Sequence, residues 1–275
     1  MTGFYWLASY PKSGNTWLRL ALRSLHGRGA PVDFTAEDTW IPMGASRALF
    51  DQLLEIDSSD LTNDEAEVLR PRFYEMLTHA ATEPMLRKIH DAYVYTAEHE
   101  PLFPPAATQG VVYIVRDPRD VAVSYAHHCR SSVDRTIEVM RNPTAAIAGD
   151  DSRQLRQRLL SWSGHVESWL DAPALRLLLL RYEDMLAAPH EALARVASFL
   201  DWKVNSHSVA AAVEATRFEK LKSEEQRHRF FENPSGSGSF FRRGIAQGWR
   251  DSLTAEQVQR IEQDHGCVME RLGYL

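Results

Sequence analysis

The chain has 275 residues, of which 44% are hydrophobic and 25% charged, and its formal net charge is −6. This composition is typical of a globular protein with a well-buried core, and the negative charge argues against general binding to nucleic acid or to an anionic membrane. The two cysteines, Cys129 and Cys267, lack metal-ligand spacing, and no apolar run has the length of a signal-peptide core or a membrane span. We therefore expect a cytoplasmic protein.

Strands and helices are predicted to alternate along the chain. The apolar runs 4–9, 111–115 and 175–182 have the form of strands buried on both faces, and 85–90 is a weaker candidate. Helices are expected to begin at residues 15, 118 and 189 and directly after residue 254, and to span 62–80 and 153–170. The alternation indicates an α/β fold in which one domain, residues 1–275, is built on a central parallel sheet flanked by helices.

Capping signals support several of these helix starts. Asp117 can cap a helix that begins at Pro118, and Thr62 and Thr254 each stand three residues before a Glu or Gln, as in a capping box. The stretch "NPSGSGS", residues 233–239, has the composition of a mobile loop and is a candidate lid that orders on ligand binding.

The stretch "YPKSGNTW", residues 10–17, joins the first strand to the first helix. A glycine-containing turn at this place aims backbone N–H groups and the positive end of the helix dipole at an anion. Its candidate ligands are Lys12, Ser13, Gly14, Asn15 and Thr16, with Trp17 available to stack on a base. The alternative is a tight turn with a surface lysine and a core tryptophan. The strand–loop–helix context favours the anion site.

This loop differs from the nucleoside triphosphate loop, because its lysine precedes the glycine and the pattern GxxxxGK[ST] does not occur. The strands 111–115 and 175–180 are followed by Arg116 and Arg181, where a metal-dependent site would place an aspartate. An arginine there attracts phosphate and repels Mg²⁺. The sequence thus predicts an anionic ligand that is bound without a metal ion.

Four motifs, "YPKSGNTW", "VRDPRDVAVSYAHH", "RYEDM" and "FFRRGIAQGWR", occur in the order and rough spacing seen in the PAPS-dependent sulfotransferases. Those enzymes move a sulfonate from 3′-phosphoadenosine 5′-phosphosulfate (PAPS) to an acceptor hydroxyl or amine and release PAP. The resemblance runs from residue 4 to the closing "MERLGYL" and is stronger to the compact bacterial, cytosolic-type members than to the membrane-anchored Golgi enzymes. It implies a P-loop-like PAPS site between the first strand and helix.

The resemblance also implies donor-binding roles for individual residues. Residues 12–16 match the loop that grips the 5′-phosphosulfate, and Trp17 matches the residue that packs on the adenine. Arg116 and Ser124 match the pair that binds the 3′-phosphate. Alone, an arginine is most often a solvated surface charge and a helical serine usually bonds its own backbone. The presence of the opening loop favours the binding roles.

Further donor contacts are implied in the second half of the chain. These are Tyr182, Thr216 and Phe218 at the adenine, and Arg242, Arg243 and Gly244 in a late loop over the 3′-phosphate. The signal for Thr216 and Phe218 is weak, so it stays open whether these two residues contact the adenine or have no role in binding. The family's late loop reads G-x-x-G-D-W-K, whereas Gln247 stands at the second glycine here, which leaves the shape of this loop open. Only Thr254 survives from the family's dimer segment, so the oligomeric state is not predicted.

The candidate catalytic base is His90 in "LRKIHDAY", which resembles the family's Lys-x-His element. A histidine at a strand end lies where α/β sheets bind ligands, although a merely half-exposed histidine is the plain alternative. His127 and His128 are the rivals. In the implied mechanism His90 takes the acceptor's proton, and Lys12 meets the charge that develops on the bridging oxygen of the donor.

Two further residues complete the implied catalytic set. Ser124 would hold Lys12 off the donor until the acceptor arrives. Lys88 would orient the sulfonate, or would be an exposed charge at a strand edge. A sulfonate in transfer carries less negative charge than a phosphoryl group, so positioned lysine, histidine and backbone donors can replace Mg²⁺, and no metal cofactor is expected.

The acceptor is expected to be a small molecule or natural product whose identity is open, as is the choice between O- and N-sulfonation. Seven aromatic residues could line its pocket or could be plain core: Trp40, Phe50, Phe73, Tyr74, Tyr93, Tyr95 and Phe103. Two other functions compete with sulfonate transfer. One is a nucleotide-dependent kinase of related fold, and the other is a non-catalytic protein that binds PAP or PAPS.

Overall fold

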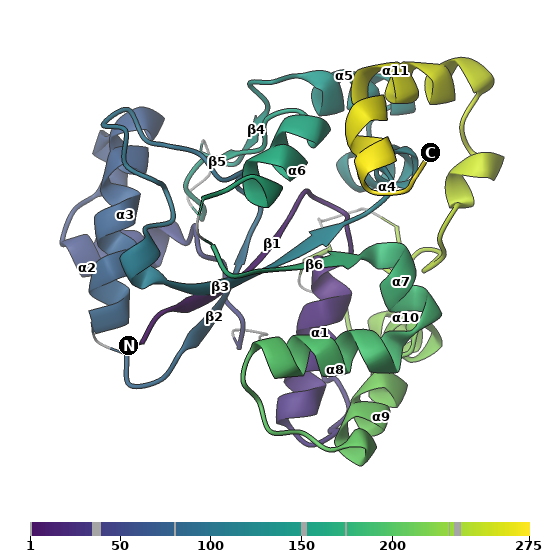
Figure 1. Cartoon of the computed structure of the whole chain (residues 1–275), viewed down its shortest axis with the longest axis horizontal. Coiled ribbons are helices and arrows are strands. Elements are labelled where there is room, and N and C mark those ends of the chain that lie inside the picture. Colours follow the sequence, from purple (N-terminus) through teal and green to yellow (C-terminus); the bar gives the residue numbers. More distant parts are fainter. Residues whose placement is uncertain are drawn as a thin grey trace.

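A four-stranded parallel sheet in the order β2-β1-β3-β6 organises the computed structural model (Figure 1). Its strands are β1 (Phe4–Ser9), β2 (Met85–Ile89), β3 (Thr108–Val115) and β6 (Leu177–Arg181). The structure describes residues 2–34, 40–79, 81–149, 153–173, 175–230, 232–233 and 238–275. The predicted parallel sheet is confirmed, including the weaker candidate strand at 85–90.

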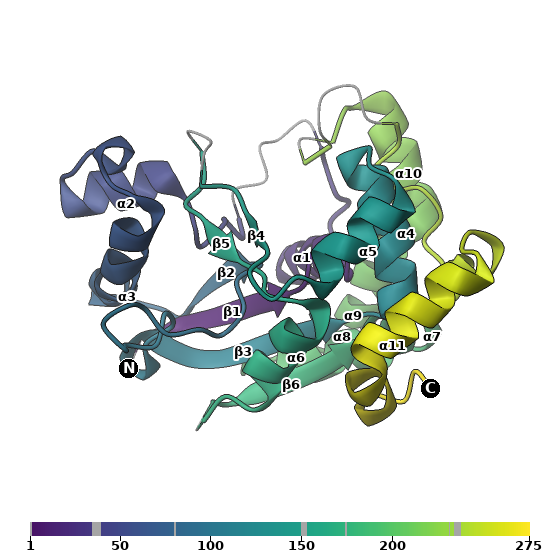
Figure 2. The same cartoon turned by 90° about the horizontal axis from the view of Figure 1, so that it is seen from above.

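Helices cover both faces of this sheet. Their bounds are α1 (Asn15–His26), α2 (Arg47–Leu54), α3 (Asn63–His79), α4 (Pro118–Cys129), α5 (Val133–Arg141), α6 (Trp162–Leu170), α7 (Tyr182–Ala187), α8 (Pro189–Phe199), α9 (Ser206–Ala215), α10 (Phe218–Arg227) and α11 (Ala255–Arg271). In Figure 1, α1, α8 and α9 lie below the sheet, whereas α4, α5, α6 and α11 lie above it, and Figure 2 shows α4, α5 and α11 packed side by side.

The side chains of β1 explain why both faces are covered. All six residues of this strand are buried; Phe4, Trp6 and Ala8 belong to the core beneath α3, α6 and α11, whereas Tyr5 and Leu7 belong to the core beneath α1, α8 and α9. Successive strand side chains point to opposite faces, so a continuous apolar run is the pattern that a strand needs when both faces are buried. Burial of each large apolar side chain contributes roughly 1.5–3 kcal/mol.

The predicted helix over 153–170 is wrong in its first half. The helix α6 begins only at Trp162, where the Ser161 side chain accepts the N–H of Gly164. Before it, β5 (Gln157–Arg158) pairs antiparallel with β4 (Ala146–Ile147). Alternate residues are buried over this stretch, which is the period of a strand, and Leu155 and Leu159 are equally consistent with one face of a helix. The N-cap at Ser161 therefore marks the start of α6.

The predicted helix caps are formed, and most of the aromatic residues considered for the acceptor pocket are buried. Asp117 accepts the N–H of Arg119 at the start of α4, and the capping boxes that begin at Thr62 and Thr254 are formed. Aromatic residues considered for an acceptor pocket lie in the core instead, and Tyr95 is exposed; the buried ones are Phe50, Phe73, Tyr74, Tyr93 and Phe103. The centre of the candidate lid, residues 234–237, lies outside the described residues.

The ends of the strands determine where a site can form. In this parallel sheet the loop after Ser9, His90, Arg116 and Tyr182 all follow directly at the carboxyl ends of β1, β2, β3 and β6. Chain segments far apart in the sequence therefore converge at one edge, which is where open α/β sheets bind their ligands.

Candidate active site

A cavity of about 1020 Å³ lies at this edge of the sheet. Most of the predicted site residues line it: Lys12, Gly14, Asn15, Thr16, Trp17, Lys88, His90, Arg116, Ser124, Tyr182, Thr216, Phe218, Arg242, Arg243 and Gly244. Ser13 does not; its side chain is fully buried, and its hydroxyl has no hydrogen-bond partner within the described part of the chain. Four sequence motifs are thus brought to one concave surface, as enzyme sites require.

The opening loop has a strained, tightly packed backbone. Lys12 has φ +68° and Gly14 has φ +105°, both in the left-handed region. A Cβ on Gly14 would lie 2.6 Å from the Tyr182 ring, so this turn needs glycine for conformation and for space. Asn15 donates to the carbonyl of Leu7 at 2.9 Å, which ties the loop to β1. Strain that the surroundings hold in place is common at ligand-binding turns.

The ammonium of Lys12 is held inside the cavity. Its Nζ lies 4.1 Å from the centre of the Phe240 ring, a cation–π contact. Burial, and then repulsion by the Lys88 ammonium, lowers the pKa of Lys12 to about 8. At pH 7 the side chain is still charged, and it lies in a region where an anion would be strongly favoured.

Lys88 and Thr16 share one partner. Lys88 Nζ lies 3.0 Å from Oε1 of Glu232, and the Thr16 hydroxyl donates to Oε2 of the same carboxylate at 3.0 Å. Lys88 is buried, so the alternative of an exposed strand-edge charge is wrong. Arg19, one turn along α1 from Thr16, also pairs with Glu232.

His90 presents one nitrogen to the cavity. Its Nδ1 lies 2.8 Å from the Ser9 carbonyl and donates to it, so Nε2 carries the lone pair. Its backbone N–H donates to Gln157 Oε1 at 3.0 Å, which anchors the end of β2 to β5. Burial, and then the Lys88 ammonium, lowers the pKa of His90 to about 3. The imidazole is therefore neutral at pH 7 and can accept a proton at Nε2.

Two residues of α4, Ser124 and His128, line the cavity near Lys12, whereas His127 is exposed. Ser124 lines the cavity, but within the described residues no hydrogen bond joins it to Lys12. His128 also faces the cavity, and burial followed by the charge of Lys12 lowers its pKa to about 4. His127 is exposed; partial desolvation of its ring, followed by the charges of Arg242 and Lys12, lowers its pKa.

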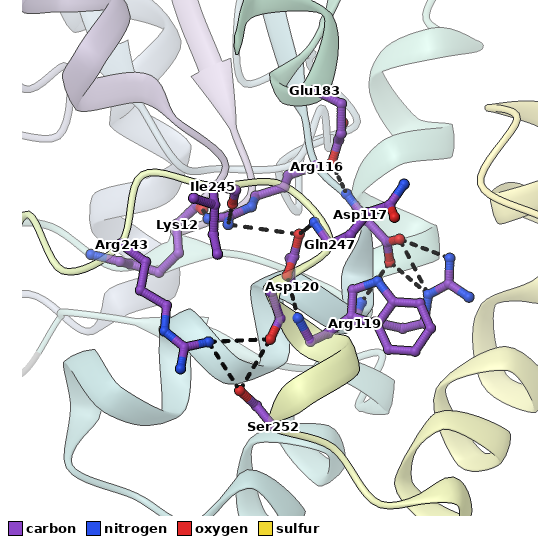
Figure 3. A network of polar contacts seen from close by, with 12 residues as sticks. Lys12, Arg116, Asp117, Arg119, Asp120, Glu183, Arg243, Ile245, Gln247 and Ser252 are labelled. Carbon is purple, nitrogen blue, oxygen red and sulfur yellow. Dashed lines mark hydrogen bonds and ion pairs between the residues drawn. The ribbon is translucent and has the colours of Figure 1, made fainter. Parts of the chain in front are cut away.

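Arg116 connects the opening loop with the late loop (Figure 3). Its guanidinium donates to the carbonyls of Lys12 at 3.3 Å and Ile245 at 3.1 Å, and it stacks 4.3 Å over the Tyr182 ring. Arg242 is close enough that Arg243 and Arg116 lower its pKa, after the effect of burial. Asp120 Oδ2 lies 3.8 Å from Arg116 Nη2 and offsets part of this charge. Clustered guanidinium groups have the chemistry to bind an anion.

Gln247 stands in the late loop at the position of the family's second glycine. It adopts φ +60°, in the left-handed region that glycine favours. Its N–H donates to Asp120 Oδ2 at 2.7 Å, and the N–H of Trp249 donates to Asp120 Oδ1 at 2.9 Å (Figure 3). The Asp120 carboxylate fixes this turn, so a residue with a side chain is tolerated at position 247.

Trp17 and Phe218 form an aromatic side of the cavity. The indole N–H of Trp17 donates to the carbonyl of Thr216 at 3.0 Å. The Thr216 hydroxyl donates to the carbonyl of Ala212 in α9. The role of Thr216 was left open by the sequence, and in the structure its hydroxyl bonds to the protein itself. The Phe218 ring packs on Gly244, where an added Cβ would lie 2.2 Å from it. Two aromatic rings therefore flank the side of the cavity nearest the late loop.

Sequence reasoning missed several residues of the site. Arg19 had a usable signal, because it follows Thr16 by three positions and shares its face of α1. Glu232 had none, since it reaches the cavity only through the tertiary fold. Phe240 and Asp120 stand within two of the quoted motifs but were given no role. Among the described residues no group of three His, Cys, Asp or Glu side chains is arranged to hold a metal ion. Over the same residues no helix combines the length and apolar character that crossing a membrane requires.

The chain belongs to the sulfotransferase family. A sulfotransferase domain model matches residues 4–273, nearly the whole chain. Luciferin sulfotransferase of Photinus pyralis is 22% identical over 94% of this chain and 69% of that protein. Flavonol 3-sulfotransferase of Flaveria bidentis is 25% identical over 97% and 81%. Sulfotransferase 1A1 of Canis lupus familiaris is 27% identical over 59% of this chain, and the match spans only 56% of that relative.

Solved structures share the fold. Mouse sulfotransferase SULT7A1 complexed with PAP has a TM-score of 0.58 at 23% identity, covering 94% of this chain and 82% of the other. Retinol dehydratase in complex with androsterone and inactive cofactor PAP has a TM-score of 0.62 at 22% identity, covering 97% and 80%. The α/β architecture predicted from the sequence is therefore that of the family.

Proposed function

We propose that this protein transfers a sulfonate from PAPS to a hydroxyl or amine of a small-molecule acceptor. The observation that supports the proposal most strongly is the convergence of Lys12, Arg116 and Arg243 with a neutral His90 at one cavity. PAPS would supply the sulfonate. The cavity fits such a ligand, because the cations Lys12, Arg116 and Arg243 line it together with the aromatic rings of Trp17 and Phe218.

Each residue has a role in this proposal. Lys12 and the backbone of the opening loop hold the 5′ side of the donor, and Arg116 with Arg243 holds the 3′-phosphate. Trp17 and Phe218 receive the base. Because Lys12 remains charged at pH 7, it can stabilise negative charge on the oxygen that leaves.

His90 would be the base that receives the acceptor's proton at Nε2. The bond from Nδ1 to the Ser9 carbonyl fixes the tautomer that this role needs. A pKa near 3 makes the imidazole a weak base in the empty protein. Anionic groups bound beside Lys12 and Lys88 would offset the two charges that lower this pKa, so donor binding is expected to strengthen the base.

A small-molecule acceptor is supported by the names of related proteins, which act on luciferin, flavonol and amines. The test is PAP release from PAPS over a panel of phenols, alcohols and amines. We expect turnover on at least one acceptor, and a loss of roughly 10²–10⁴-fold for His90→Ala, since that is the usual contribution of a general base. His207→Ala, an exposed histidine on α9, is the matched control.

Two results would contradict this proposal. An active His90→Ala would mean that another group is the base, with His128 as the next candidate because it also faces the cavity. Binding of PAP without turnover on any acceptor would favour the non-catalytic alternative. The kinase alternative predicts ATP–Mg²⁺ dependence, which Arg116, directly after β3 on the cavity wall, disfavours. Arg181, the last residue of β6, stacks on Tyr274 and does not line the cavity, so it does not bear on this alternative.

A further inference from the structure

Four charged or polar side chains from three parts of the chain meet deep in the cavity. Thr16 and Arg19 come from α1, Lys88 from β2, and Glu232 from the segment that follows α10. Oε1 of Glu232 lies 2.5 Å from Arg19 Nη2 and 3.0 Å from Lys88 Nζ, and Oε2 receives the Thr16 hydroxyl at 3.0 Å. One carboxylate thus accepts hydrogen bonds from three side chains that come from separate places in the fold.

The charges of this cluster do not balance. Arg19 and Lys88 contribute two positive charges against the single negative charge of Glu232, and Lys12 is near enough for its charge to interact with both Lys88 and Glu232. Arg19 is only 3% exposed, and its Nε has no partner within the described residues. Buried cations are costly unless an anion accompanies them, so these side chains form a place that attracts an oxyanion.

The Glu232 carboxylate uses the donors that a bound oxyanion would use. Thr16 is in the first turn of α1, directly after the anion-binding loop, and Lys88 precedes His90 by two positions on β2. A carboxylate, a phosphate and a sulfonate all accept hydrogen bonds from guanidinium, ammonium and hydroxyl groups in this manner. Glu232 therefore has the chemistry of an internal substitute for the ligand's anion.

Thr16 and Lys88 were expected to contact the 5′-phosphosulfate of the donor. We propose that Arg19 extends this subsite, and that Glu232 occupies it until the donor displaces the carboxylate. The inference rests on the proposed function. It assigns Arg19 as a donor ligand and Glu232 as an internal competitor. A donor oxyanion on these side chains would lie beside the Glu232 carboxylate, where like charges repel, so we expect the carboxylate to leave when the donor binds.

The competition has a consequence for selectivity. A ligand without an anion at its 5′ position leaves Glu232 in place, so its affinity does not depend on the Glu232 carboxylate. PAP and PAPS carry such an anion and must displace the carboxylate, so part of their binding free energy is used in that step. Removing the charge of Glu232 should strengthen the binding of PAP and PAPS and leave that of adenosine 3′-phosphate unchanged.

The first experiment is calorimetric titration of the full chain with adenosine 3′-phosphate, PAP and PAPS. We expect Glu232→Gln to bind PAP and PAPS about tenfold more tightly than the wild type, the size of effect that one lost charge repulsion produces. Glu224→Gln removes a charge from α10, where Glu224 pairs with Arg227, and serves as the control for net charge.

The outcomes of this titration separate the two proposals. If Glu232→Gln binds PAPS equally or more weakly than the wild type while the wild type binds PAP, the inference is wrong and the proposed function is retained. Weaker binding would mean that Glu232 supports Lys88 in the loaded site. If the wild type binds neither PAP nor PAPS, the proposed function fails and the inference fails with it.

The second experiment isolates Arg19. On the Glu232→Gln background, Arg19→Met leaves no uncompensated buried carboxylate, so the fold should persist, which circular dichroism and melting check. We expect this double variant to bind PAPS at least tenfold more weakly than Glu232→Gln alone, because a charge-assisted hydrogen bond is lost. Unchanged PAPS binding would show that Arg19 only anchors Glu232, which would overturn the assignment.

Discussion

The cavity has two halves that are built in different ways. The loop half consists of residues 10–17, Arg116 and the late loop 242–250, and the His90 half consists of His90 with Met43, Ile147 and Gln154. In the loop half, short contiguous motifs follow directly on strand ends and bond to one another through Arg116. In the His90 half, single side chains arrive from separate segments, for example through the bridge between Met43 and Lys88.

This difference explains why one half of the cavity can be recognised as motifs in the sequence and the other half cannot. A phosphate-binding turn needs a defined backbone, so several neighbouring residues are constrained together and form a motif. An acceptor surface needs only shape and a few side chains, which many segments can supply. The loop half should therefore respond to single substitutions with large, ligand-specific effects.

The largest expected effect is at Lys12. Lys12→Met should reduce the rate of sulfonate transfer by roughly 10²–10³-fold, the usual cost of removing one group that stabilises developing charge. The fall should be in kcat, measured as PAP release with the best acceptor of the panel. Lys203→Met, an exposed lysine beyond α8, is the control. A change confined to KM would make Lys12 a binding residue only.

The next effect is at the late loop. Arg243→Ala should weaken PAP binding by about 10–100-fold, because a charge-assisted hydrogen bond to a phosphate contributes on the order of 1.5–3 kcal/mol. Binding of AMP, which lacks the 3′-phosphate, should change little. Isothermal titration measures both, with Arg195→Ala on α8 as the control for surface charge. Equal losses for PAP and AMP would refute a 3′-phosphate role.

A smaller effect should appear in the pH dependence of PAP binding. Lys12 has a pKa of about 8 in the empty protein, and a bound anion favours its charged form and raises that pKa. Below pH 7 the lysine is protonated in both states. Between the two pKa values only the complex holds the proton, so binding takes up as much as one proton and affinity falls by up to about tenfold per pH unit.

The proton uptake can be measured by titration at pH 8.5 in buffers of different ionisation enthalpy. Lys12→Arg should abolish it, since a guanidinium keeps its charge throughout this range. Uptake that persists in Lys12→Arg would assign the titration to another group.

The smallest effect is expected at Gln247. Gln247→Gly should change the free energy of unfolding by less than about 1 kcal/mol, in the stabilising direction, because relief of a left-handed backbone slightly exceeds the entropy that glycine adds to the unfolded chain. Urea unfolding measures this change. Gln259→Gly in α11 is the contrast, with a loss of about 1 kcal/mol expected for glycine within a helix. Equal losses at both positions would contradict the backbone argument.

The same division explains what the sequence could predict. The strands, their parallel order and the opening loop followed from apolar runs and from Gly14, whose conformation and lack of a side chain the turn requires. The extent of α6 did not, because the spacing of Leu155 and Leu159 fits a helix as well as a strand. Glu232 and the contact of Phe240 with Lys12 were missed, because only tertiary packing brings these residues to Lys88 and Lys12.

The most direct test of the central claim is calorimetric titration of the purified chain with PAP, set against ATP–Mg²⁺ and AMP. The loop half is expected to bind one PAP per chain, and AMP much more weakly because it cannot engage Arg116 and Arg243. A bound ligand should also raise the melting temperature, since it stabilises only the native state. Absence of PAP binding together with binding of ATP–Mg²⁺ would contradict the assignment of this cavity to a phosphosulfate donor.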